Sequence, residues 1–233
     1  MTTVLSRRRR LFALVPLSLV AALLSVLVWG VRAPDADAVT FAAQGHHGML
    51  TPRTAAQQAF HDSMRKLWED HVTWTRLAIV EFADGSAGFP ETATRLLRNQ
   101  DDIGDAIKPF YGQAAGEQLS ALLHDHITIA VEVLKAARSG DTPAFADANA
   151  RWYANANDIA DFLAAANPRF WPKAAMRADM RTHLDQTLPE ASDELSGNYA
   201  GSVADYDAVH AHILDMADML SAGIIGQFPG RVR

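Results

Sequence analysis

The 233-residue sequence contains no cysteine. A disulfide framework, a thiolate zinc site, an iron–sulfur cluster and a cysteine nucleophile are therefore all excluded. The sequence also lacks a glycine-rich phosphate loop, a Gly-x-Ser-x-Gly elbow and a His-Glu-x-x-His motif. Nucleotide-dependent chemistry and serine-hydrolase chemistry thus have no support in the sequence.

Basic residues are scarce outside the N-terminal region. Five of the 21 basic residues and two of the 27 acidic residues lie in residues 1–38, which leaves 16 and 25, a net charge of −9, in the rest of the chain. Proteins that bind nucleic acid usually carry a basic patch or stripe that neutralises phosphates. An acidic body without such a stripe predicts no nucleic-acid partner.

Residues 1–38 have the pattern of a targeting segment. Four arginines at 7–10 precede an apolar run at 11–31, and Ala36-Asp37-Ala38 follows, so the segment reads as a signal peptide cleaved after Ala38. At about 1.5 Å per residue the apolar run is also long enough to span a bilayer of roughly 30 Å, so an uncleaved membrane anchor is the alternative. Either reading places the body outside the cytoplasm, secreted or anchored in the cell envelope. Arg9-Arg10-Leu11-Phe12 also resembles the core of a twin-arginine signal.

The body divides into a short spacer and one domain. Residues 39–53 contain glycine and proline without periodicity and are predicted to be a flexible spacer. From residue 54 to about 226, apolar residues recur at three- and four-residue steps, which indicates helices, and no run alternates as strands do. Because short connections make successive helices antiparallel neighbours, we predict an all-α antiparallel bundle of five to six helices.

Helix ends are predicted from caps, glycines and prolines. Pro109 is expected to stop the second helix, residues 99–104 to interrupt it, and Pro189 to break or kink the fifth. Thr142-Pro143 is expected to open the fourth helix with a cap and a first-turn proline. The expected helices cover about 54–84, 91–108, 114–137, 142–166, 172 onward and 198–222.

Histidines occupy the apolar stripes of four helices. Burying an imidazole costs free energy unless it is hydrogen-bonded or ligated, so four on separate helices could converge. Facing helices of a bundle build metal sites from histidine and carboxylate ligands, and this donor set suits zinc, iron, manganese or copper. Asp207 shares a helix face with the histidine three residues later. The predicted metal ligands are His71, His126, His183, Asp207 and His210.

Two further polar residues belong to the candidate site. Asn155 takes the equivalent place in the fourth helix and is expected to support a histidine from behind. Arg76 lies near the same face as the histidines and could bind an anionic ligand, with a salt bridge to Glu69 or an exposed head as the alternative. The histidines themselves could instead form a purely structural polar network.

Several segments resemble a group of uncharacterised bacterial proteins, many of which are exported. They are residues 67–76 (LWEDHVTWTR), 95–104 (RLLRNQDDIG), 107–112 (IKPFYG), 151–156 (RWYANA) and 216–220 (MADML). The resemblance covers roughly residues 64–229 and implies a self-contained domain. The group has no established activity, so the resemblance implies no catalytic residues.

Three functions follow from these observations. The leading one is an envelope binding protein whose buried polar cluster holds a metal ion or a small ligand. The second is a structural or protein-interaction module with a structural polar core, which would expose a broad apolar patch. The third is a metal-dependent hydrolase or oxidoreductase, which needs an open coordination position beside a pocket. The sequence favours a non-enzymatic role over an enzymatic one. It identifies no protein partner, and an uncleaved N-terminal segment would insert into the membrane.

Overall fold

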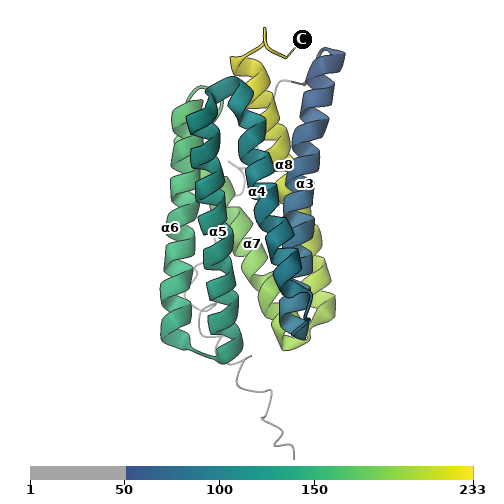
Figure 1. The fold of residues 1–233 in the computed structure, drawn as a ribbon, viewed down its shortest axis with the longest axis vertical. Coiled ribbons are helices and arrows are strands. Elements are labelled where there is room, and N and C mark those ends of the chain that lie inside the picture. Colours follow the sequence, from purple (N-terminus) through teal and green to yellow (C-terminus); the bar gives the residue numbers. More distant parts are fainter. Residues whose placement is uncertain (1–50, 233) are drawn as a thin grey trace, which may run out of the picture.

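The computed structural model describes residues 51–232, which form six α-helices without a strand. The all-α fold is therefore confirmed, whereas the targeting segment and most of the spacer lie outside the described residues. Figure 1 shows the helices side by side along the long axis of the molecule. Their bounds are α3 (Ala55–Asp84), α4 (Phe89–Tyr111), α5 (Gln113–Ser139), α6 (Thr142–Ala166), α7 (Lys173–Ser196) and α8 (Tyr199–Gln227).

The bundle is closed by a contact between its first and last described helices. Each helix packs against the next one in sequence, and α8 returns to pack against α3 (Figure 1). Short connections make the neighbours antiparallel. Helix α7 also contacts α3 and α5, so it lies deeper in the bundle than its place in the sequence requires. Side chains on α3, α5 and α7 can consequently meet in the interior.

Capping residues set the helix ends. The Thr54 hydroxyl accepts a hydrogen bond from the Gln57 backbone N–H, as an N-cap does. Gly85 ends α3 with a φ of 67°, a left-handed conformation that residues with a Cβ rarely adopt. Helix α6 begins at Thr142 as expected, but its cap is the side chain of Asp141 rather than that of Thr142.

Two prolines lie inside helices that were expected to end or break there. Helix α4 runs through Pro109 to Tyr111 and stays helical over residues 99–104, and α7 runs through Pro189 to Ser196. An internal proline removes one backbone hydrogen bond and costs about 3 kcal/mol in an isolated helix. Both helices are flanked by neighbours that bury their apolar faces, and this packing outweighs the local cost.

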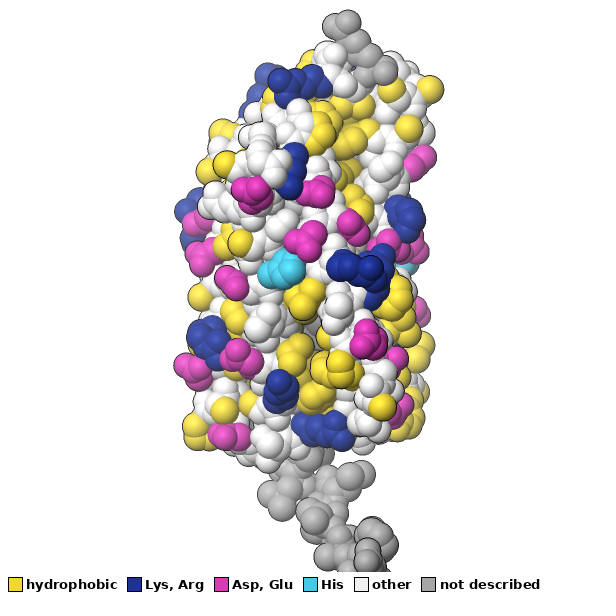
Figure 2. Space-filling model, viewed as in Figure 1, with side chains coloured by type: hydrophobic (Ala, Val, Ile, Leu, Met, Phe, Trp, Pro, Cys, Tyr) yellow, Lys and Arg dark blue, Asp and Glu magenta, His cyan; other side chains and the backbone are white. Residues whose placement is uncertain are grey.

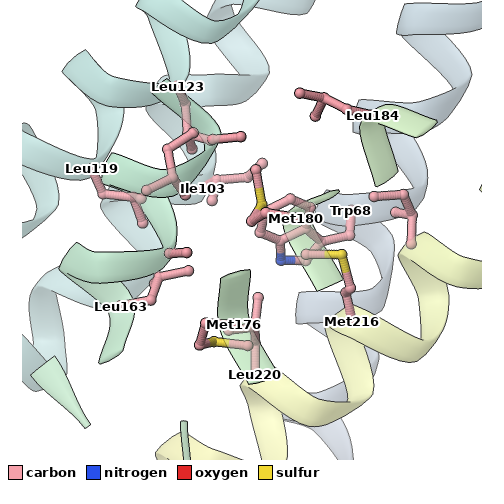
Figure 3. Close-up of a cluster of buried hydrophobic side chains, with 14 of the residues drawn as sticks. Trp68, Ile103, Leu119, Leu123, Leu163, Met176, Met180, Leu184, Met216 and Leu220 are labelled. Carbon is pink, nitrogen blue, oxygen red and sulfur yellow. The ribbon is translucent and has the colours of Figure 1, made fainter. Parts of the chain in front are cut away.

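One main hydrophobic core runs through the bundle. Figure 3 shows a part of it, to which every one of the six described helices contributes at least one labelled side chain. Where α4 and α5 cross, a Cβ added to Gly104 would lie 2.6 Å from the carbonyl oxygen of Gly116, so only glycine allows this approach. The labelled core residues are Trp68, Ile103, Leu119, Leu123, Leu163, Met176, Met180, Leu184, Met216 and Leu220.

Helix α8 is unusually apolar. Within the described residues it is the one helix long and apolar enough, by length and composition, to cross a membrane, but 56% of that stretch is buried inside the bundle. Its apolar residues therefore serve as one wall of the core.

Candidate ligand site in the bundle core

Three of the four stripe histidines meet in the interior. His71 of α3, His126 of α5 and His183 of α7 are all buried. The His183 ring lies between the others, with ring centroids 5.9 Å from His71 and 6.0 Å from His126. We call these three residues the imidazole cluster.

Asn155 fixes the orientation and the tautomer of His126. Its side-chain nitrogen donates to the Leu122 carbonyl at 3.0 Å, so its Oδ1 atom faces the histidine as an acceptor. The Nδ1–H of His126 therefore donates to Oδ1 at 2.8 Å, and Nε2 is left with a free lone pair. That Nε2 atom is buried and has no hydrogen-bond partner. Asn155 thus supports the histidine from behind, as the sequence suggested.

The other two imidazoles have weaker partners. The Gln100 side-chain nitrogen, which donates to the Leu96 carbonyl at 2.9 Å, lies 3.3 Å from Nδ1 of His71. The Thr187 hydroxyl donates to the His183 carbonyl at 2.8 Å and lies 3.5 Å from the Nδ1 atom of the same histidine. Neither histidine has an acidic partner among these contacts, so no negative charge there favours its protonated form.

All three imidazoles are neutral at ordinary pH. Burial, together with the nearby His126, lowers the pKa of His71 to about 3, against the opposing hydrogen bond to Gln100. Burial also lowers the pKa of His126 to about 4, against the opposing hydrogen bond to Asn155. Burial, followed by the two neighbouring histidines, holds the pKa of His183 well below its usual value. The cluster therefore presents uncharged nitrogen atoms to its surroundings.

The imidazole cluster lines a small apolar pocket of about 50 Å³. A cavity of about 10–15 Å³ holds one water molecule and one of about 150 Å³ holds benzene, so this pocket has room for a few heavy atoms. No Asp, Glu, Lys or Arg side chain lines it. The lining residues are His71, Thr75, Ala78, Ile79, Phe89, Leu96, His126, Ile127, Ala130, Val131, Val133, Leu134, Trp152, His183, Thr187, Leu188 and Ala191.

Trp152 adds a second unpaired polar atom to the pocket wall. Its indole Nε1–H is buried without a hydrogen-bond partner. Its ring lies 5.3 Å from that of His126, centroid to centroid, at an interplanar angle of 34°. An unpaired donor and an unpaired acceptor thus lie on neighbouring rings of the same pocket.

The remaining two predicted metal ligands lie elsewhere. Asp207 is exposed, and His210 lies at the surface with its Nε2 atom 3.4 Å from a carboxylate oxygen of Glu69. The predicted stripe of α8 was wrong in its first half, because Tyr199 and Val203 are 59% and 52% exposed. The buried residues of that half are Ser202, Val209 and Ile213.

The structure therefore does not bring the five predicted metal ligands together. Within residues 51–232 no group of three or more His, Cys, Asp or Glu side chains is placed to hold a metal ion. Two imidazoles that share a tetrahedrally coordinated ion at a nitrogen–metal distance of about 2 Å have ring centroids about 5 Å apart. The His126 and His183 rings are farther apart than that and nearly parallel, at 27°.

Arg76 belongs to a second buried cluster rather than to the pocket. Its guanidinium lies 3.3 Å from Glu190 and 3.0 Å from Glu194, and so it pairs with these two residues rather than with Glu69. It also donates to the Ser202 hydroxyl, which donates to Glu194 at 2.6 Å. Burial raises the pKa of Glu190 to about 7, against the opposing effect of Arg76. We call Arg76, Glu190, Glu194 and Ser202 the carboxylate cluster.

Sequence reasoning missed the carboxylate cluster because of Pro189. Because a break was expected at Pro189, the helical stripe that contains His183 and Thr187 was not followed beyond the proline. Extended past the proline, the same spacing reaches Glu190 and Glu194, both of which are buried. Gln100, the partner of His71, was missed for the same kind of reason, since an interruption was expected there.

Comparisons with known protein families, with curated proteins and with solved structures find no match to this chain. The geometry of the pocket and of its surroundings is therefore the basis for assigning a function.

Proposed function

We propose that the protein is a binding protein that holds a small, uncharged, largely apolar ligand in the core pocket beside the imidazole cluster. The observation that carries the proposal is the Nε2 atom of His126, which has no partner among the described residues, while Asn155 binds the other ring nitrogen and the residue lines an apolar pocket. A buried polar atom without a partner is uncommon in proteins and costs stability. A bound ligand would supply the missing hydrogen bond.

The pocket selects against charge. A charged group taken from water into an apolar site needs an opposite charge or several hydrogen bonds. The lining provides neither, because its histidines are neutral and its other members are mostly aliphatic. The nearest buried carboxylates, Glu190 and Glu194, are already paired with Arg76.

A transition-metal ion is the competing ligand, since neutral imidazoles suit zinc and copper. The spacing and the near-parallel rings of His126 and His183 count against it. Elemental mass spectrometry of the purified full-length protein separates the two. We expect no stoichiometric metal, and zinc or copper that is lost in His126→Leu would overturn the proposal.

Binding of probes with three heavy atoms, which match the volume of the pocket, tests the proposal directly. We expect NMR titrations of the full-length protein to show saturable binding of ethanol or acetonitrile, and binding at least tenfold weaker for formate and ethylammonium. Ala130→Leu places three more heavy atoms in the pocket and should abolish binding. Ala146→Leu is the matched control, because Ala146 is exposed on α6. Equal binding of charged and neutral probes would contradict the proposal.

An interaction module is the second candidate. Within the described residues the large hydrophobic side chains that are clearly exposed are those of Leu77, Tyr199 and Val203, on α3 and the start of α8. Figure 2 shows acidic and basic side chains interspersed over one face of the molecule, without a region of a single sign. If this candidate is correct, Val203→Ser should weaken self-association in sedimentation experiments.

We further propose that the domain acts outside the cytoplasm. The four arginines, the apolar run and the Ala36-Asp37-Ala38 ending of residues 1–38 support this location. N-terminal sequencing of the protein from its native host distinguishes the two forms. Cleavage after Ala38 means a secreted protein, an intact leader in the membrane fraction means an anchored one, and an intact leader in the cytoplasm would contradict the proposal.

A further inference from the structure

Two residues that line the core pocket, His126 and Trp152, each have a buried polar atom without a partner among the described residues. The Nε2 atom of His126 can only accept a hydrogen bond, because the proton of this imidazole lies on Nδ1. The Nε1–H group of Trp152 can only donate one. Both atoms are buried without a partner, and the two ring centroids are 5.3 Å apart.

We infer that the ligand carries a hydroxyl group, which lies between His126 and Trp152. The hydroxyl proton is donated to Nε2 of His126, and the oxygen accepts from Nε1–H of Trp152. A hydroxyl is the smallest organic group that both donates and accepts at one atom, so it satisfies both unpaired atoms at once. This inference rests on the proposed function and names the chemical class of its ligand.

The other residues that line the pocket indicate the size and the apolar character of the rest of the ligand. Beyond the two rings the wall consists mainly of aliphatic side chains from α3, α5 and α7, such as Ile79, Val133 and Ala191. A volume of about 50 Å³ admits a few heavy atoms. The expected ligand is therefore a short-chain alcohol with its apolar end away from the histidine.

Other small polar groups meet only part of this requirement. A ketone accepts from Trp152 but cannot donate to His126. A carboxylic acid or an aliphatic amine is charged at neutral pH and is disfavoured by a lining without counter-charge. A site that hydrogen-bonds a hydroxyl discriminates strongly against an analogue that lacks it, because its own polar atoms are then left unpaired.

Ethanol and acetonitrile test the inference, since each has three heavy atoms, both can accept a hydrogen bond from Trp152, and only the alcohol can donate one to His126. We expect the full-length protein to bind the alcohol at least tenfold more tightly in NMR titrations. In His126→Leu the preference should fall below twofold. In Trp152→Phe both probes should weaken by a similar factor, because both use the indole N–H. His124→Leu is the matched control on α5, where His124 pairs with Asp101 at the surface.

The ¹⁵N chemical shift of His126 Nε2 provides a readout that does not depend on how the variants fold. Ethanol should move this signal in the direction of a newly accepted hydrogen bond, and acetonitrile should leave it in place. Equal affinity for both probes, with no shift at Nε2, would contradict the inference that the ligand carries a hydroxyl group, but not the proposed function. Failure of both probes to bind would overturn the two together, because a trapped water then satisfies both atoms.

Discussion

The imidazole cluster and the carboxylate cluster both include residues of helices α3 and α7, but they differ in how the cost of burying their polar groups is reduced. In the imidazole cluster, burial lowers the pKa of each histidine and leaves neutral rings. In the carboxylate cluster, an arginine and a serine hydroxyl surround two acidic side chains. The first cluster avoids charge, whereas the second compensates it.

The two clusters also differ in how completely their polar atoms are paired. His126, Trp152 and Gln100 each have a buried polar atom without a partner, but no such atom belongs to Arg76, Glu190, Glu194 or Ser202. A fully paired buried network is a structural element, and one that is partly paired has capacity left for a ligand. For this reason we place the proposed ligand site beside the imidazole cluster.

The largest expected effect is acid destabilisation through the imidazole cluster. The folded-state pKa values, about 3 for His71 and about 4 for His126, lie below 6.5, so the unfolded chain binds protons first as pH falls. Each histidine contributes about 1.4 kcal/mol per pH unit, and three contribute up to about 4 kcal/mol per unit between pH 6.5 and 4. Urea unfolding at a series of pH values measures the slope. A stability that stays flat over this range would show that the histidines are protonated in the fold.

Removal of the guanidinium should have the next largest effect. Arg76→Met leaves Glu190 and Glu194 buried without a counter-charge, which typically costs about 3–5 kcal/mol. Arg177→Met is the control, since Arg177 pairs with Asp161 near the surface and such pairs contribute at most about 1 kcal/mol. Chemical denaturation at pH 8 compares the two. Similar losses in both variants would mean that the carboxylate cluster is open to solvent.

Glu190→Gln should increase the stability of the protein at pH 8, by less than Arg76→Met decreases it. The folded-state pKa of about 7 lies above the ordinary value of 4.5, so the folded protein holds a proton that the unfolded chain has lost. Stability is therefore lost as pH rises from 4.5 through 7, and the glutamine variant should be about 1–3 kcal/mol more stable at pH 8. Below pH 4.5 the two proteins should be similar. A variant that is less stable at pH 8 would show that ionised Glu190 strengthens the fold.

The smallest effect is expected at the two residues that the sequence placed in the site and the structure places outside it. His210→Ala and Asp207→Asn should each change the free energy of unfolding by less than about 0.5 kcal/mol, because both positions lie at the surface. Neither should alter the binding of ethanol. Loss of binding in His210→Ala would mean that the site extends across α8.

The sequence predicted the helices and three members of the site for a simple reason. A histidine in a strong apolar stripe, such as His71 or His126, must face the core whatever the neighbouring helices are. Helix α8 is apolar on more than one side, so its pattern did not determine which face is buried, and His210 was placed inward. An apolar stripe therefore predicted the buried face of a helix only where the opposite face is polar.

Two other features depend on long-range packing and were beyond the sequence pattern. The contact of α3 with α8, which closes the bundle, joins helices far apart in the chain. The continuation of α7 through Pro189, which brings Glu190 next to Arg76, depends on support from the neighbouring helices. In both cases tertiary contacts outweigh the local preference.

The protonation state of His126 at pH 7 is the most direct test of the central claim, and a long-range ¹H–¹⁵N spectrum of the histidine side chains measures it. The structure predicts a neutral ring with the proton on Nδ1, donated to Asn155, and a bare Nε2 atom that remains bare as the pH is lowered to about 5. A ring protonated on Nε2, or an imidazolium at pH 7, would remove the free acceptor and with it the proposed ligand site.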